Sequence, residues 1–180
     1  MKIVNPNSLA ETLNAVNEVF FYGHSLPSSQ REEVARWIGS RQGKSGSYAN
    51  MFAPTEKDFK EGIRLFTGER ILPNSLYSHI LGEEACRALI LLDVPLADVR
   101  DALKKATLGM IKALERYEAE GYFRRRPGIF CCGKCTSSLW RHLAVGGLKD
   151  NESYLASGMK ALKLHRDGSG KWRRSPFYYT

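Results

Sequence analysis

Three of the four cysteines in this chain lie within five residues of one another. Cys132 and Cys135 enclose Gly133 and Lys134 in a C-x2-C motif that directly follows Cys131. Two thiolates at this spacing can bind one zinc ion, and a helix beginning after the motif, together with the Lys134 amine, would favour the thiolate forms. A closed structural zinc site has four ligands, so the motif needs partners from elsewhere in the chain.

Two further thiols are available as ligands, and the histidines His79 and His142 are weaker candidates. The predicted metal site comprises Cys132, Cys135, Cys131 and Cys86. The alternative is a group of loosely packed free cysteines, because no second C-x2-C pair is present. Clustered thiols of this kind differ from a disulfide framework and indicate a reducing compartment. The first residues also lack the apolar segment of a signal peptide, so we expect a cytoplasmic protein.

The formal charge of +8 belongs entirely to the last third of the chain. Residues 1–120 hold 15 Lys and Arg against 16 Asp and Glu, whereas residues 121–180 hold 12 against 3. The arginines of this region stand beside aromatic residues, as in Arg124–Arg126 and around Trp172. Clustered positive charge attracts phosphates and carboxylates, which predicts an anionic ligand or partner. The alternative is a basic rim that serves solubility.

Apolar residues recur every third or fourth position along most of the chain, and strand-like alternation is nearly absent. This pattern predicts an all-α fold of six main helices beginning near residues 9, 29, 76, 96, 136 and 151. Residues 49–75 form an insertion, with a short helix predicted to end at Gly68. No apolar run of about 18 residues exists, so we expect no membrane span.

Paired in order, these helices give three antiparallel hairpins at about 8–48, 76–123 and 135–172, within a single domain of residues 1–180. Each hairpin ends on a phrase with the frame Q-x3-G-x-aromatic or a decayed form of it. The phrase residues are Gln42, Gly46 and Tyr48, then Gly121 and Phe123, then Gly170 and Trp172. A short motif that recurs at the ends of helices is typical of stacked helical repeats. The glycine provides the left-handed turn, and the aromatic covers the joint between hairpins.

This phrase resembles the QW motif of the terpenoid-cyclase and protein-prenyltransferase superfamily. The resemblance implies an α/α-toroid, a barrel of inner and outer helices around a central cavity. Three hairpins would make half of such a barrel. Two copies could therefore close a toroid as a homodimer, an arrangement favoured by the aromatic end of the chain at Trp172, Phe177, Tyr178 and Tyr179.

The resemblance further implies a groove that binds an isoprenoid diphosphate or a similar amphiphilic anion. Arg141, Arg124 and Arg173 would then meet the phosphates, and Trp140 would line the groove. The sequence lacks the superfamily's catalytic signatures, because Asp93 and Asp98 are too far apart for its aspartate cluster. We therefore keep an alternative open, a non-catalytic helical-repeat scaffold that binds an acidic protein or nucleic acid through its basic C-terminal third. Whether the chain is an enzyme is left undetermined.

Overall fold

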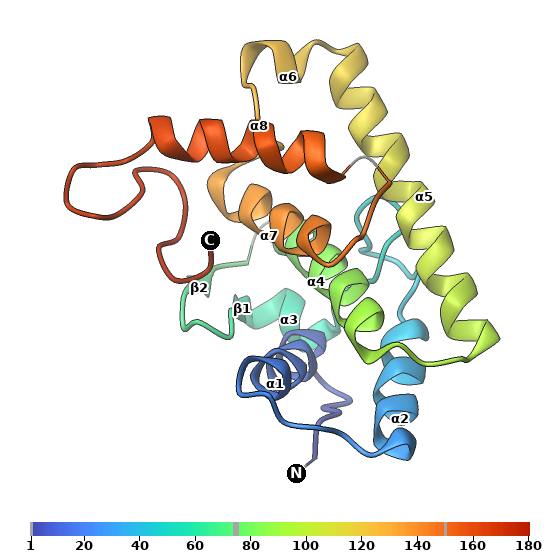
Figure 1. The fold of residues 1–180 in the computed structure, drawn as a ribbon. Helices are drawn as coiled ribbons and strands as arrows, with labels where there is room; N and C mark the ends of the chain where they lie inside the picture. The colour runs from blue at the N-terminus through green and yellow to red at the C-terminus, as the bar shows by residue number, and fades with distance from the viewer. Residues whose placement is uncertain (1, 74–75, 150) are drawn as a thin grey trace.

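The computed structural model describes residues 2–73, 76–149 and 151–180, and there the chain is mostly helical (Figure 1). The predicted all-α class is confirmed, since the strands in this part form a single two-stranded antiparallel hairpin. In chain order the elements are α1 (Leu9–Phe21), α2 (Ser28–Gly39), α3 (Glu56–Glu61), β1 (Ile63–Arg64), β2 (Arg70–Ile71), α4 (Leu76–Leu92), α5 (Ala97–Ala119), α6 (Tyr122–Arg125), α7 (Gly133–Ala144) and α8 (Asn151–Leu164). Within these residues, no helix combines the length and the apolar character that crossing a bilayer requires.

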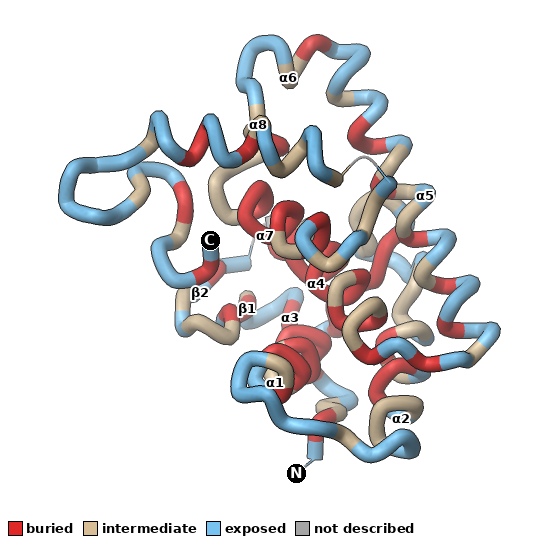
Figure 2. Tube along the Cα trace, viewed as in Figure 1, coloured by how far each residue is buried: buried red, intermediate tan, exposed pale blue. Residues whose placement is uncertain are grey.

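The main helices form two rows, and α4 lies at the centre of the molecule (Figure 1). An inner row consists of α1, α4 and α7 in contact, and α2 and α5 pack together outside it. The buried residues gather along the inner row (Figure 2), where α4 is apolar on most of its circumference. A helix that is apolar all round is stable only when neighbours cover each face. The central position of α4 between the other helices therefore follows from its composition.

Two of the predicted hairpins pack as expected, since α5 contacts α4 and α8 covers α7. The first pair differs, because α1 packs mainly against α4 and α2 packs against both α4 and α5, rather than against one another. The physical reason is again the apolar surface of α4, which offers both helices more area to bury than they offer each other.

The phrase around Tyr48 forms a loop that we call the first joint (residues 40–53). The Gln42 side chain donates from Nε2 to the Asn50 carbonyl oxygen at 2.8 Å, and Gln42 also forms an isolated bridge with Phe52. The loop then lies against α5, where a Cβ atom at Gly109 would be only 1.8 Å from the Ala49 carbonyl oxygen. The glutamine amide therefore stabilises the backbone of its own loop.

The chain from residue 120 to residue 132 forms the corresponding second joint. Gly128 of this segment lies against α8, where a Cβ atom on Gly128 would be 2.4 Å from the Ser157 carbonyl oxygen. Each joint therefore crosses the outer helix of the following pair, near Gly109 in one case and Gly158 in the other. The glycines of the three phrases, Gly46, Gly121 and Gly170, all have left-handed φ angles of 86°, 68° and 87°. These matched positions support a repeat, while closure into a toroid stays a prediction.

The insertion differs from its prediction after its first helix. α3 has a capping box in which the Thr55 side chain and the Asp58 side chain bond each other's backbone, but it ends at Glu61. The next residue, Gly62, has φ 75° and no room for a side chain, since a Cβ would lie 2.4 Å from the Ile71 carbonyl oxygen. The following residues pair as β1 and β2 instead of continuing the helix to Gly68. The last two residues of the predicted insertion, 74–75, lie outside the described residues.

The C-terminal segment folds back over the inner row. Tyr179 is 1% exposed, and its hydroxyl donates to Glu84 of α4 at 2.8 Å. Phe177 and Tyr178 remain 43% and 75% exposed. Part of the aromatic surface from which the homodimer was predicted is therefore covered by the chain itself, and the homodimer stays a prediction.

Candidate metal centre and adjacent pocket

The cysteine motif lies at the start of α7, opposite the first turn of α4. Gly133 begins the helix, so Cys135 belongs to its first turn and Cys132 is the N-cap residue. One nitrogen of His79, on α4, and the sulfur atoms of Cys131 and Cys135 all lie within 4.8 Å of one another. Imidazole nitrogen and thiolate sulfur are ligands for zinc and other transition metals, so this group can hold a metal ion.

The third sulfur, that of Cys132, belongs to the same cluster. The Cys131 and Cys135 thiols donate hydrogen bonds to it, and the backbone N–H groups of Cys135 and Lys134 add to them. Together these donors lower the pKa of Cys132 to about 2. Hydrogen bonds within the trio raise the pKa of Cys131 and of Cys135. The Cys132 sulfur thus adjoins the other two but lies outside the group within 4.8 Å that they form with His79, and a metal ion would displace the remaining thiol protons.

His79 is held in place by an aromatic of the first joint. The ring of Tyr48 stacks on the imidazole with 3.5 Å between ring centroids and 25° between planes. Burial lowers the pKa of His79 to about 4, which keeps the ring neutral, the form that binds metals. Its Nδ1 atom is buried without a hydrogen-bond partner among the described residues. An unpartnered buried nitrogen beside the sulfurs of Cys131 and Cys135 can bind a cation.

Glu83 lies one helical turn beyond His79 and is fully buried. Neither of its carboxylate oxygens has a hydrogen-bond partner among the described residues, since the nearby Ser138 hydroxyl donates to the Ile80 carbonyl oxygen at 3.3 Å. Burial raises the pKa of Glu83 well above its usual value, and the charge of Cys132 adds to this effect. A carboxyl group in this position needs either a proton or a cation, so the chemistry of Glu83 also fits a metal nearby.

The fourth predicted cysteine lies outside the cluster. Cys86 is fully buried on α4 and is absent from the group that His79 forms with the other cysteines. It follows His79 by seven residues, a rise of about 10 Å along a helix, so the two cannot meet at one ion. The structure places His79, the weaker candidate of the sequence, in the position predicted for Cys86. The four-residue spacing of His79 and Glu83, which puts both on one face of α4, is the local signal for this face.

Arg141, predicted to meet an anion, lies in a buried ion pair. Its Nε donates to a Glu84 carboxylate oxygen at 2.7 Å, and its guanidinium lies 4.9 Å from the Tyr179 ring centroid. Arg87 occupies the matching position on α4 and also faces Glu84, at 3.9 Å. Burial raises the pKa of Glu84, but the charges of Arg141 and Arg87 and hydrogen bonds from Arg141 and Asn17 lower it further, so the net shift is downward. No acid lies within a helical turn of Arg141 in sequence, and its partner comes from another helix.

The remaining predicted residues do not form one site. Arg124 and Arg173 are exposed and make no ion pair with any residue that the structure describes. Trp172 lies under the Arg166 guanidinium, 5.9 Å from the ring centroid, in the third phrase. Trp140 instead lines a pocket in the second joint, and no predicted arginine lies in the wall of that pocket.

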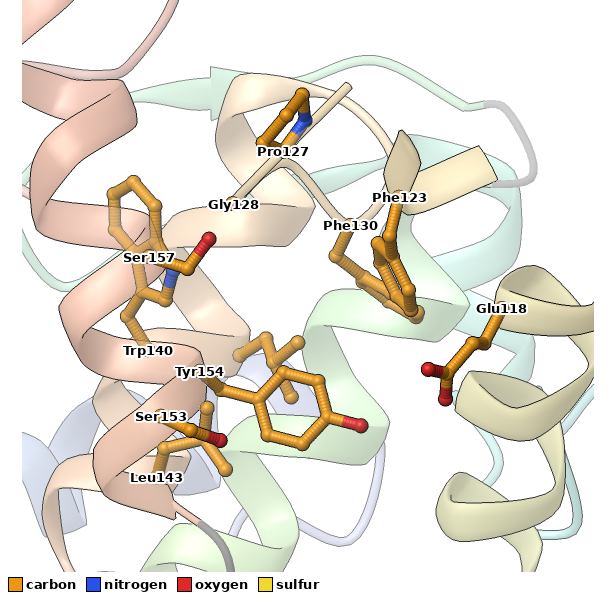
Figure 3. Close-up of a pocket in the computed structure, with 11 residues that line it drawn as sticks. Glu118, Phe123, Pro127, Gly128, Phe130, Trp140, Leu143, Ser153, Tyr154 and Ser157 are labelled. Carbon is orange, nitrogen blue, oxygen red and sulfur yellow. The ribbon is translucent and has the colours of Figure 1, made fainter. Parts of the chain in front are cut away.

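This pocket has a volume of about 390 Å³ and lies between α5, α6, α7 and α8 (Figure 3). Four aromatic side chains contribute to its wall, namely Phe123, Phe130, Trp140 and Tyr154. Phe130 directly precedes Cys131, so the pocket and the cysteine cluster share one loop. Sequence reasoning missed Phe130, Tyr154 and the rim residue Glu118, because these residues come from three separate segments.

Comparisons of the chain with family models, with curated proteins and with solved structures found no match.

Proposed function

We propose that this chain is a helical-repeat protein that binds one zinc ion through Cys131, Cys132, Cys135 and His79. The observation that carries the proposal is the convergence of the Cys131 and Cys135 sulfurs with the His79 imidazole, which has a buried, unpartnered nitrogen, and the Cys132 sulfur adjoins the two thiols. A set of three sulfurs and one nitrogen is a standard tetrahedral zinc environment. Carboxylate-rich sites favour magnesium or calcium instead, and this cluster offers Glu83 alone.

Four protein ligands would leave no open position, so the ion would act as a structural crosslink. It would join the second joint and α7 to α4, whose His79 is itself fixed by Tyr48 of the first joint. Metal binding of this kind contributes directly to the free energy of folding. The cysteine loop between α6 and α7 is already held by two hydrogen bonds, from the Tyr122 hydroxyl to the Cys131 carbonyl oxygen at 2.8 Å and from the Phe130 amide to Thr136 Oγ1 at 3.0 Å, and the ion would add to them.

The test is metal analysis of the purified protein, followed by single serine substitutions at the three clustered cysteines. We expect one zinc per chain, its loss in each variant, and a decrease of about 4 kcal/mol or more in the free energy of unfolding after chelation. Cys86→Ser is the matched control, since it replaces a buried thiol on α4 and should keep the metal. Glu83→Gln should also keep it if the four proposed ligands are complete.

Cobalt substitution provides a second readout that does not depend on the variants folding. A tetrahedral site with thiolate ligands should give intense visible bands and sulfur-to-cobalt charge transfer in the wild-type protein. Protein that contains no stoichiometric zinc or iron, gives no such bands and has four freely titrating thiols would contradict the metal site.

A second candidate function is ligand binding in the aromatic pocket of the second joint. The resemblance to terpenoid cyclases and prenyltransferases implies an isoprenoid diphosphate, and the apolar wall of the pocket suits the hydrocarbon part of such a ligand. The diphosphate part has less support, because Arg141 is paired with Glu84 and no basic side chain lines the pocket. Calorimetric titration with geranyl diphosphate tests this version.

The alternative of an acidic protein or nucleic-acid partner is supported by exposed charge. Residues Arg124–Arg126 and Arg173–Arg174 are all exposed. Binding to a polyanion such as heparin, weakened steeply by salt, would favour this alternative over the pocket.

A further inference from the structure

The pocket of the second joint presents aromatic faces from four separate places in the chain. Phe123 and Tyr154 meet edge to face with 6.3 Å between centroids, and Trp140 and Phe130 form the deeper, buried part of the wall. Gly158 lets the Trp140 ring lie flat on α8, since a Cβ atom there would be 2.3 Å from the indole nitrogen. Aromatic faces carry partial negative charge and attract cations that are stripped of water.

Among the described residues of the pocket wall, Glu118 is the only one with a side chain that is charged at neutral pH. Its carboxylate points from α5 toward the hydroxyl end of Tyr154 (Figure 3). It makes no ion pair or side-chain hydrogen bond with any residue that the structure describes. The pocket therefore has one negative charge that no neighbour neutralises.

The three arginines at residues 124–126 make other contacts, and none of them forms an ion pair with this carboxylate. Arg124 lies against Gly121, Arg125 donates to the Glu120 carbonyl oxygen at 3.0 Å, and Arg126 lies over the Tyr122 ring. The overall charge of +8 attracts anions at long range, but salt screens charges more than about 8 Å apart. At contact distance a ligand meets the aromatic rings and Glu118.

We propose that this pocket binds an apolar organic cation, a substituted ammonium with an aromatic or aliphatic body. This inference rests on the second candidate function, ligand binding in the pocket, and reverses the ligand charge that the family resemblance implies. The rings would surround the ammonium, Glu118 would balance its charge at the rim, and Leu139 and Leu143 would contact the apolar body. A diphosphate in the same place would face the Glu118 carboxylate.

The experiment titrates the zinc-loaded full chain with three probes of similar body and different charge. These are benzyltrimethylammonium, neutral benzyl alcohol and anionic benzylphosphonate, followed by isothermal calorimetry. We expect the ammonium to bind at least about tenfold more tightly than the alcohol and the phosphonate to show no binding. Glu118→Gln should weaken ammonium binding about fivefold and leave the alcohol unchanged.

Two further variants make the result specific to the pocket. Glu115→Gln removes a carboxylate one turn earlier on the exposed face of α5, outside the pocket wall, and should leave all three affinities unchanged. Phe123→Leu keeps an apolar side chain but removes a ring face, and should weaken only the ammonium, about threefold.

Equal binding of ammonium and alcohol, or tighter binding of the phosphonate, would overturn the cation proposal and leave pocket binding in place. Absence of binding by every probe would overturn both. Loss of ammonium affinity in Glu115→Gln equal to that in Glu118→Gln would show a general charge effect and would also overturn the proposal.

Discussion

The two joints of this protein follow one path and differ in how they are filled. The first joint buries Met51, Phe52 and Ala53 completely, with Met51 packed so closely on Gly82 of α4 that a Cβ atom there would lie 2.8 Å from it. The second joint crosses the next outer helix at the matching position but leaves a pocket of about 390 Å³ at that crossing. The first joint also borders a cavity, of about 540 Å³ at residues 46–48, but no described residue of α5 lines it, so the crossing itself is filled. The repeated backbone path thus determines where each joint runs. Its side chains determine whether the crossing of the outer helix is filled, which we call a solid joint, or leaves a pocket, which we call a hollow joint.

The candidate metal centre lies where the two joints meet. Tyr48 of the first joint holds His79, and the second joint supplies Cys131 and Cys132. A metal here would therefore connect the solid joint to the hollow one through α4. The metal would thus fix the end of the hollow joint that carries the cysteines, although the pocket of that joint is open.

The largest effect that we expect compares Arg141 with Arg87, which occupy matching positions on α7 and α4. Arg141→Met should lower the free energy of unfolding by about 3 kcal/mol, because it leaves the buried Glu84 carboxylate without its closest charged partner. Arg87→Met should cost about 1 kcal/mol, since its guanidinium is 3.9 Å from Glu84. Urea denaturation of both zinc-loaded variants measures the difference.

Methionine keeps the length and apolar volume of the side chain in both variants, so each serves as the control for the other. Equal losses would show that Glu84 is held mainly by Asn17 and Tyr179, which donate to it at 3.0 and 2.8 Å. That result would contradict the central role given to Arg141.

A second prediction tests the solid and hollow joints directly. Gly109→Ala should destabilise the protein by about 2 kcal/mol, because the new Cβ atom meets the fixed Ala49 backbone of the solid joint. Gly158→Ala should cost about 1 kcal/mol, since it meets the Trp140 side chain, which can move into the pocket. The gain in helix propensity is the same in both and cancels.

Thermal or urea unfolding gives the two free energies, and the environment of Trp140 gives an independent readout. Gly158→Ala should shift tryptophan fluorescence and weaken pocket ligands, whereas Gly109→Ala should do neither. A larger loss at Gly158 than at Gly109 would mean that the second joint is as tightly packed as the first.

The sequence predicted the main helices because their apolar residues recur at helical spacing over many turns. It also located the cysteine motif and the joints, since glycine and aromatic residues mark them locally. It named His79 only as a weaker ligand candidate than Cys86, because more than 50 residues separate His79 from Cys131 and Cys135 and only the contact between α4 and α7 joins them. The pocket of the second joint could not be predicted either, since its walls come from several segments that are distant in the sequence.

The turn before the outer helix α8 packs against one buried titratable group, His142. Gly147, in the turn before α8, lies over His142, so that a Cβ atom there would be 2.3 Å from the imidazole. The His142 nitrogens have no hydrogen-bond partner among the described residues. Burial lowers the pKa of His142 to about 4, while Glu84 and Arg87 of α4 act on it in opposite directions. The side chain is therefore neutral in the folded protein.

The smallest effect that we expect is the pH dependence due to His142. In the unfolded chain a histidine gains a proton below about pH 6.5, whereas the folded protein does not until about pH 4, so stability falls as the pH is lowered through this window. This group alone should cost about 1 kcal/mol at pH 5.8 relative to pH 7. His142→Leu should remove that part of the pH dependence and change stability little at pH 7, because it deletes two unpartnered polar atoms.

The measurement is the difference in unfolding free energy between wild type and His142→Leu at each pH, with equal zinc content, so that the titration of other groups cancels. Histidine Cε1–H resonances give the folded pKa directly and serve as the control for the assignment. An unchanged acid limb in the variant would mean that His142 is protonated in the folded protein, with its charge met by Glu84. In that case the ion pair between Arg141 and Glu84 would share its carboxylate with a second cation, and the larger loss expected for Arg141→Met over Arg87→Met should shrink as well.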